Sequence, residues 1–171
     1  MTKPPRPEPR IYLDCDGVLA DFDRGATEVL GMPPRAFEAR FGLRAFWARL
    51  GAAEDFFGRL ELLPDAMELY GAVRHRRPVI LTGLPRGGWA EAQKRRWADQ
   101  HFPGVEVITT SSALKREHCH PGDALVDDTV KFRHLWEREG GVFIEHLSAA
   151  GSVAELRRRG FLEPAADAAT A

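Results

Sequence analysis

Five short apolar runs, separated by helical patterns, constrain the fold of this chain more than any other feature. The runs are IYLD at 11–14, PVILT at 78–82, VEVIT at 105–109, DALVDD at 123–128 and GVFIE at 141–145. Most are nearly continuous in apolar residues, which is typical of strands that are covered on both faces. Strands that alternate with helices favour right-handed crossovers and a parallel sheet. The sequence therefore predicts an α/β fold, with a Rossmann-like parallel sheet of about five strands and helices on both faces.

Helical patterns fill the gaps between these runs. Apolar residues recur at spacings of three and four at Ala66, Leu69, Tyr70 and Val73, and again at Phe132, Leu135 and Trp136. The last helix should begin at Ser152, because Ser152 and Glu155 form a capping-box pattern, and Gly160 suits its carboxyl-terminal end.

Residues 18–63 contain no convincing strand but hold three aromatic-rich helical pieces, RAFEARFG, RAFWARLG and EDFFGRLELL. We expect them to form a small helical cap inserted after the first strand, over the sheet edge where open α/β sheets bind ligands. The core domain then comprises residues 11–17 and 64–162. The polar ends, residues 1–10 and 163–171, are predicted to be flexible. A chain of 171 residues has room for one such core with an insertion, but not comfortably for two independent domains.

The composition limits the classes of partner that we expect the protein to bind. The chain has 24 Lys and Arg against 25 Asp and Glu, so no bulk charge attracts a nucleic acid polymer or a membrane. The first apolar run ends at Asp14 after three residues and cannot be a signal segment. The two cysteines show no spacing typical of a disulfide framework. We therefore expect a cytoplasmic monomer or homodimer that binds a small molecule.

Polar residues follow several of the predicted strands. Asp14, Cys15, Asp16 and Gly17 end the first strand, Thr82 and Gly83 end the second, and Asp127 and Asp128 end the fourth. The carboxyl ends of parallel strands open onto one crevice, so we expect these residues to meet. Carboxylates this close repel one another unless a cation relieves them, and oxygen ligands favour Mg²⁺. No His or Cys is partnered with these aspartates, which argues against zinc.

A magnesium ion beside a carboxylate, a hydroxyl and a lysine suits phosphoryl transfer. An aspartate can attack phosphorus and form an aspartyl phosphate, which divides the reaction into two steps. A second aspartate can protonate the leaving alcohol and later deprotonate the attacking water.

The order of these motifs resembles the haloacid dehalogenase-like (HAD) superfamily of phosphohydrolases. DxDGV, a strand ending in Thr, a Lys and a strand ending in DD follow one another between about residue 11 and residue 146. The resemblance implies that Asp14 is the nucleophile and that Asp16 is the general acid and base, with its backbone carbonyl as a metal ligand.

The resemblance assigns the remaining motifs to phosphate and metal. Thr82 and Gly83 would bind the phosphoryl group, and Lys115 would neutralise it. Asp127 and Asp128 would complete the Mg²⁺ site with Asp14 and Asp16.

Within the superfamily, DGVLADFD, the cap sequence ending FFGRLELLPDA, a basic residue at Arg86 and LVDD resemble the 5′(3′)-deoxyribonucleotidase group. In that group aromatic residues of the cap stack on the nucleobase, and the corresponding positions are Phe22 and Phe37. The sequence departs from the group at Glu38, where a tryptophan can occur, and at Gly83, where a serine occurs.

The expected function is therefore a Mg²⁺-dependent phosphomonoester hydrolase, a 5′-nucleotidase acting on (deoxy)ribonucleotides through an aspartyl-phosphate intermediate. Two alternatives remain open. One is a phosphatase of a sugar or other small metabolite phosphate, and the other is a non-catalytic phosphate-binding domain.

Two local interpretations accompany this assignment. Lys94 competes with Lys115 for the phosphate-neutralising role, but we expect Lys94 on the solvated face of a helix and favour Lys115. The HCH sequence at 118–120 predicts an exposed loop near Pro121 rather than a metal site, and Cys15 is expected to be a small buried filler.

Overall fold

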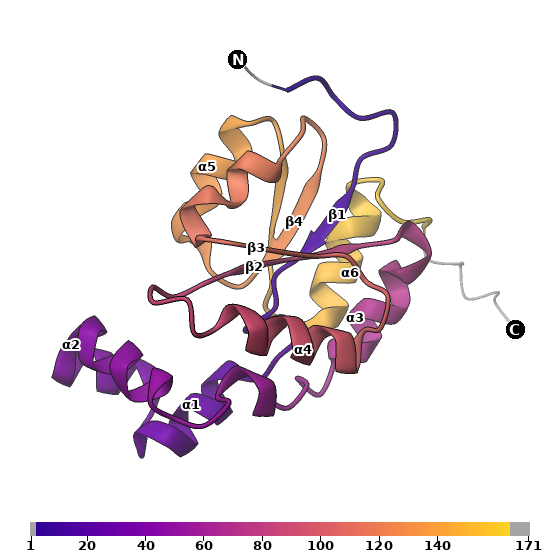
Figure 1. Cartoon of the computed structure of the whole chain (residues 1–171). Helices are drawn as coiled ribbons and strands as arrows, with labels where there is room; N and C mark the ends of the chain where they lie inside the picture. The colour runs from indigo at the N-terminus through magenta and orange to yellow at the C-terminus, as the bar shows by residue number, and fades with distance from the viewer. Residues whose placement is uncertain (1–2, 165–171) are drawn as a thin grey trace, which may run out of the picture.

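A five-stranded parallel sheet forms the centre of the protein (Figure 1). The computed structural model describes residues 3–164, so most of the predicted C-terminal tail lies outside the described residues. The strands are β1 (Ile11–Leu13), β2 (Val79–Gly83), β3 (Val107–Thr110), β4 (Ala124–Asp127) and β5 (Val142–Glu145). They lie in the order β3-β2-β1-β4-β5, with every neighbouring pair parallel. Each predicted strand is present, and the predicted fold class is confirmed.

Six α-helices and four short 3₁₀ helices surround this sheet in the described part of the chain. The α-helices are α1 (Phe22–Leu30), α2 (Pro34–Gly51), α3 (Ala66–Val73), α4 (Glu91–His101), α5 (Arg133–Arg138) and α6 (Ala149–Arg158). The 3₁₀ helices are η1 (Phe57–Arg59), η2 (Arg74–Arg76), η3 (Ser112–His118) and η4 (Val130–Phe132).

Apolar side chains on the two faces of the sheet form two separate clusters. Ile11 and Leu13 belong to the larger cluster, which also contains buried residues of α3, α4 and α6. Tyr12, between them, belongs to the smaller cluster with Trp136 of α5, and the centroids of the two rings are 5.4 Å apart. Successive side chains of a strand point to opposite faces, which explains why neighbours enter different clusters. Helices therefore cover both faces, as predicted.

Residues 18–63, the predicted cap, include α1, α2 and η1. Figure 1 shows α1 and α2 together at the lower end of the molecule, beyond β1. The chain leaves and re-enters the core at one place, because the Leu63 N–H donates to the Leu19 carbonyl over 2.8 Å. Within α2 the backbone bends at Gly42, where φ is 82°, and this bend separates the two helical pieces seen in the sequence. The division of the chain into core and cap domains stays a prediction.

Helix α6 does not begin where the capping-box pattern predicts. Ser148 is the N-cap, and its hydroxyl accepts the Gly151 N–H over 3.1 Å. Ser152 instead lies inside the helix, buried, with its hydroxyl 2.8 Å from Nδ1 of His146. The predicted start is therefore wrong, because Ser148 provides the extended backbone that precedes a helix and Ser152 faces the core.

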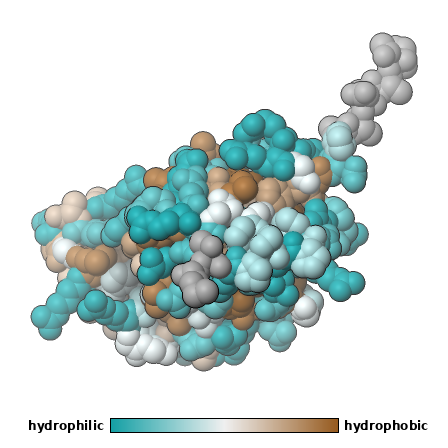
Figure 2. Space-filling model, turned by 90° about the horizontal axis from the view of Figure 1, so that it is seen from above, coloured by the Kyte–Doolittle hydropathy of each residue, from teal (hydrophilic) through white to brown (hydrophobic). Residues whose placement is uncertain are grey.

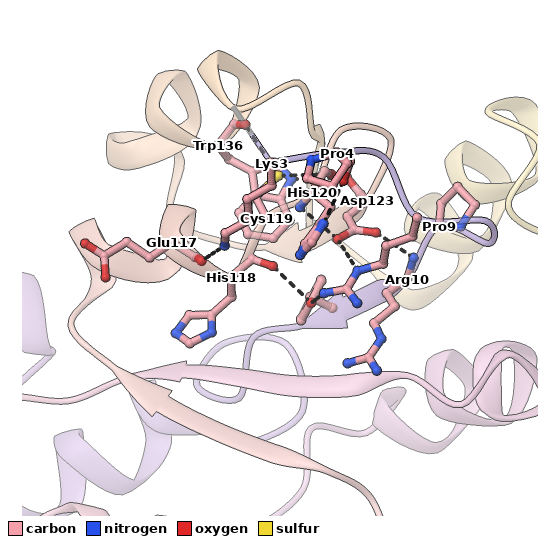
Figure 3. Close-up of polar contacts among 12 residues, drawn as sticks. Lys3, Pro4, Pro9, Arg10, Glu117, His118, Cys119, His120, Asp123 and Trp136 are labelled. Carbon is pink, nitrogen blue, oxygen red and sulfur yellow. Dashed lines mark hydrogen bonds and ion pairs between the residues drawn. The ribbon is translucent and has the colours of Figure 1, made fainter. Parts of the chain in front are cut away.

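The N-terminal segment packs on the loop that precedes β4, as Figure 3 shows. The fully buried Asp123 accepts the backbone N–H of Arg10 over 2.8 Å and that of His120 over 3.0 Å. Nδ1 of His120 lies 2.8 Å from the Pro4 carbonyl oxygen. Residues 3–10, part of the segment predicted to be flexible, thus make specific contacts with the core.

The prediction of an exposed HCH loop is wrong for its central residue. Cys119 is 2% exposed, and its Sγ lies 3.8 Å from the Trp136 carbonyl oxygen. The loop is buried here because it folds back against the smaller apolar cluster. Cys15 is also a buried free thiol, as predicted for a small filler.

Figure 2 shows the face that lies uppermost in Figure 1. Hydrophilic residues cover most of this face, with hydrophobic residues in smaller areas between them. Among residues 3–164, no helix has both the length and the apolar character that crossing a bilayer requires.

Candidate active site

Lys115 joins two of the predicted site carboxylates at the carboxyl end of the sheet. Its Nζ lies 2.8 Å from Oδ1 of Asp14 and 2.7 Å from Oδ2 of Asp127, and all three residues are buried. Burial opposes the charge of this ammonium group, but the carboxylates of Asp14 and Asp127 outweigh it and raise the pKa of Lys115. Lys115 is therefore a fixed positive charge beside Asp14.

Three carboxylates form a group that suits a hard cation. Asp14, Asp127 and Asp128 each offer an oxygen, and these oxygens all lie within 4.8 Å of one another. Burial and the charge of Asp14 raise the pKa of Asp127, and raise that of Asp128 to about 7. A divalent cation would relieve this repulsion, and an oxygen-only ligand set favours Mg²⁺ over zinc. The residues present therefore fit the predicted Mg²⁺ site, although the side chain of Asp16 is not in this group.

Gly17 brings the backbone against this carboxylate group. Its φ is 78°, and a Cβ at this position would overlap the carboxylate of Asp128, within 2.5 Å of its Cγ. Only glycine has both this backbone freedom and no side chain, so Gly17 allows the chain to turn while Asp128 stays beside Asp14.

Gly17→Ala should weaken Mg²⁺ binding by about 10- to 100-fold, because the new methyl group displaces the Asp128 carboxylate. Gly31→Ala is a matched control: φ at Gly31 is 74°, and its Cβ would meet no atom within 4 Å. Calorimetric titration with Mg²⁺ measures both variants. Equal Mg²⁺ affinities in the two variants would show that the contact with Asp128 has no part in metal binding.

Lys94 is buried in the site, which corrects the prediction that it lies on a solvated helix face. Its side chain is 2% exposed, and its ammonium group pairs with Oδ2 of Asp16. It also donates to Oγ1 of Thr82 and to the Gly83 carbonyl, each over 2.9 Å. The ring centroid of Phe57 lies 4.4 Å from Nζ and covers it. Both candidate lysines therefore lie in the site, Lys115 beside Asp14 and Lys94 beside Asp16.

The sequence does contain a signal for the burial of Lys94. The N-cap residue Ala90 and, within α4, Lys94, Trp97 and Ala98 are spaced by four, three and one, so they share one face of the helix, and all four are buried. This apolar spacing is hard to recognise in the sequence, because several neighbours of Lys94 are charged. The charge of Lys94 is stabilised because Asp16 and Thr82 lie where this buried face of α4 contacts the sheet.

Asp16 keeps one oxygen free of protein partners. Burial raises the pKa of Asp16, whereas the adjacent Lys94 opposes this shift. Oδ2 pairs with Lys94, while Oδ1 has no hydrogen-bond partner within residues 3–164. A buried carboxylate oxygen without a partner at the wall of a cleft can accept or donate a proton to a ligand.

A cleft of about 1310 Å³ lies between the carboxyl end of the sheet and the inserted helices. The residues that line it on the two sides include Asp14, Asp16, Gly17, Gly83, Arg86, Lys94 and Asp128, and Phe22, Arg35, Leu43, Arg44, Trp47 and Phe57. The structure thus brings the predicted Phe22 and Arg86 into the same cleft as the carboxylates.

Phe37, predicted to stack on a nucleobase, is not among the lining residues of this cleft. Its ring packs 4.7 Å from that of Phe41 and 6.4 Å from that of Phe46, measured between centroids. Trp47, which sequence reasoning missed, lines the cleft instead and packs 6.2 Å from Phe22. Phe37 therefore contributes to the packing of α2 rather than to the cleft wall.

No protein-family model matches the sequence. The chain is 24% identical over 141 residues to the mitochondrial 5′(3′)-deoxyribonucleotidase of Mus musculus. This alignment covers 70% of the chain and 64% of that protein, so the chain spans less than two thirds of the length of this relative.

Several solved structures share the fold at low sequence identity. A HAD-superfamily hydrolase from Ehrlichia chaffeensis is similar with a TM-score of 0.56 and 12% identity, over 89% of this chain and 98% of that one. A hydrolase from Streptococcus pneumoniae gives 0.55 and 11%, over 90% and 98%. A subfamily IA HAD-superfamily hydrolase from Geobacter sulfurreducens gives 0.51 and 14%, over 94% and 100%. The chain therefore has the fold of HAD-superfamily hydrolases, which confirms at the level of the fold the resemblance predicted from its motifs.

Proposed function

We propose that this protein is a Mg²⁺-dependent phosphomonoester hydrolase that forms an aspartyl phosphate on Asp14 and acts on nucleotides in the cytoplasm. One observation carries this proposal. Asp14 and Asp16 each pair with a different buried lysine at one end of the sheet, in a cleft that they both line. Two carboxylates with separate partners can perform separate steps of one reaction.

The residues divide the work as follows in this proposal. Asp14 attacks the phosphorus atom, while Lys115 neutralises a phosphoryl oxygen. Asp16 donates a proton to the leaving alcohol and later removes one from the water that attacks the aspartyl phosphate. A Mg²⁺ ion held by Asp14, Asp127 and Asp128 would neutralise charge on the phosphoryl group.

Two features support a nucleotide as the substrate. The aligned relative is a deoxyribonucleotidase, and the rings of Phe22 and Trp47 line the cleft, where aromatic faces can stack on a base. The cleft is also larger than the roughly 300–1,000 Å³ typical of small-molecule sites, so a whole nucleotide fits within it.

The test is hydrolysis by the purified protein. We expect turnover of p-nitrophenyl phosphate with Mg²⁺, loss of turnover with a chelator, and faster hydrolysis of 5′- or 3′-nucleotides than of sugar phosphates. Mg²⁺ binding without turnover of any ester would favour a non-catalytic phosphate-binding domain. Preference for sugar phosphates over every ribo- and deoxyribonucleotide would support the phosphatase activity but contradict the nucleotide specificity.

A further inference from the structure

Helix α2 differs from the other exposed helices in how its arginines are paired. Each of the other arginine-containing α-helices has at least one arginine paired with a glutamate three or four residues away: Arg24 with Glu28, Arg95 with Glu91, Arg133 with Glu137, and Arg158 and Arg159 with Glu155. Such pairs offset charge along a helix surface. In α2 four arginines accompany one acidic residue, Glu38, and none of the four forms an ion pair within residues 3–164.

Two of these four arginines lie at the cleft. Arg35 and Arg44 line it, one on each side of the bend at Gly42, whereas Arg40 and Arg49 do not. A guanidinium group stays charged at any ordinary pH. The inserted helix thus presents unpaired positive charge to the cleft.

A third arginine lines the cleft on the side of the core. Arg86 follows β2, lines the same cleft, and forms no ion pair within the described part of the chain. Trp47 lies three residues after Arg44 on α2 and also lines the cleft, so an aromatic face and a cation lie on one side of the helix.

The acidic residues of the cleft do not neutralise these arginines. Asp14 and Asp16 pair with the two buried lysines. Asp21 caps α1 by accepting the Arg24 N–H over 3.2 Å, and neither Asp21 nor Asp23 forms an ion pair with an arginine of α2 in the described residues. No carboxylate of residues 3–164 therefore pairs with Arg35 or Arg44, which leaves both guanidinium groups able to bind an anionic ligand.

We propose that the substrate carries a second anionic group, a phosphate or a carboxylate, which Arg35 and Arg44 bind on the side of the cleft opposite the reacting phosphoryl group. This inference rests on the proposed function, because it assumes that the phosphoryl group binds beside Asp14. Guanidinium groups bind phosphate and carboxylate through paired N–H donors. The substrate class is then a phosphate ester such as a nucleoside bisphosphate, with Arg86 able to contact it from the core.

Matched substrate pairs test this inference. The pairs are adenosine 5′-monophosphate with adenosine 3′,5′-bisphosphate, glucose 6-phosphate with glucose 1,6-bisphosphate, and glycerol 3-phosphate with 3-phosphoglycerate. We expect kcat/KM of the wild type to be about tenfold higher for the doubly anionic member of at least one pair, which corresponds to one charge-assisted contact. A preference in the first two pairs assigns the second group as phosphate, and a preference in the third assigns it as carboxylate.

The control variant changes the same charge on the same helix. Replacing both Arg35 and Arg44 by alanine should remove the preference, mainly through a higher KM for the doubly anionic substrate. Replacing both Arg40 and Arg49 by alanine should leave it unchanged. Equal losses of this preference in the two double variants would show that the net charge of α2 causes it, and would overturn the inference.

Binding to an Asp14→Asn variant separates this inference from the proposed function. Calorimetry compares adenosine 3′,5′-bisphosphate with adenosine 5′-monophosphate, and about tenfold tighter binding of the bisphosphate is expected. Equal affinities, together with no preference in the other two pairs, overturn the second-anion site even if the wild type hydrolyses p-nitrophenyl phosphate. Conversely, tighter binding of the bisphosphate without hydrolysis of any ester removes the proposed function and keeps the anion site.

Discussion

Asp14→Asn lowers kcat for p-nitrophenyl phosphate by about 10⁴-fold or more, because the amide that replaces the carboxylate does not attack phosphorus. Asparagine has nearly the volume of aspartate and keeps an oxygen that accepts a hydrogen bond from Lys115. Lys115 also retains its ion pair with Asp127, with 2.7 Å between Nζ and Oδ2. The variant therefore stays folded, and with Mg²⁺ at saturation, since Asp14 is also in the metal-binding group, the loss of rate reports on chemistry.

Two measurements accompany this variant. Acid quenching during turnover should leave phosphate on the Asp14-containing peptide of the wild type, and none on that of the variant. Asp99→Asn, an exposed carboxylate on α4, is the control and should keep the wild-type rate. If Asp14→Asn retains more than about one hundredth of the wild-type kcat, Asp14 is not the nucleophile.

The sheet and its acidic edge could be predicted because their signals are local. A continuous apolar run identifies a buried strand, and parallel strands must end at one edge, so Asp14, Asp127 and Asp128 had to lie near one another. The structure places oxygens of these three residues within 4.8 Å of one another. Neither the connecting helices nor the inserted segment affects that convergence.

The inserted helices were less predictable because their orientation depends on packing between distant segments. Phe37 and Trp47 both lie on α2, but the bend at Gly42 separates them. Only Trp47 reaches the cleft, while Phe37 packs against Phe41. An aromatic pattern predicts a helix face that will be covered, but it does not say whether protein or ligand covers it.

The sequence alone also could not predict which aspartate each of the two lysines pairs with. Lys94 lies in α4, which follows β2, and Lys115 lies in η3, which follows β3, so the order of elements does not say which lysine pairs with Asp14. A lysine within a charged helix usually lies in solvent, since burial of an unpaired ammonium group is costly. Asp16, Thr82 and Gly83 remove that cost for Lys94 only once the sheet and α4 are assembled.

Lys94→Met should cause the second large loss of activity. Lys94 holds the carboxylate of Asp16, the proposed general acid, at the wall of the cleft. We expect kcat for an alkyl phosphate to fall by about 10²- to 10³-fold, the range of general acid catalysis. The fall should be much smaller for p-nitrophenyl phosphate, because p-nitrophenolate leaves without needing a proton. Steady-state kinetics on both esters measures the difference.

A structural role for Lys94 predicts a different result. Loss of the fold or of phosphate binding would lower the rates for both esters by the same factor, and that outcome would remove Lys94 from the proton-transfer step. Methionine reproduces the lysine side chain as far as Cε but removes the cationic partner of Asp16, so the variant should be less stable, and both rates are measured below its melting temperature. Lys131→Met, at an exposed lysine of η4, provides the matched control and should leave both rates unchanged. The dependence on the leaving group thus assigns Lys94 to the orientation of Asp16 independently of its effect on stability.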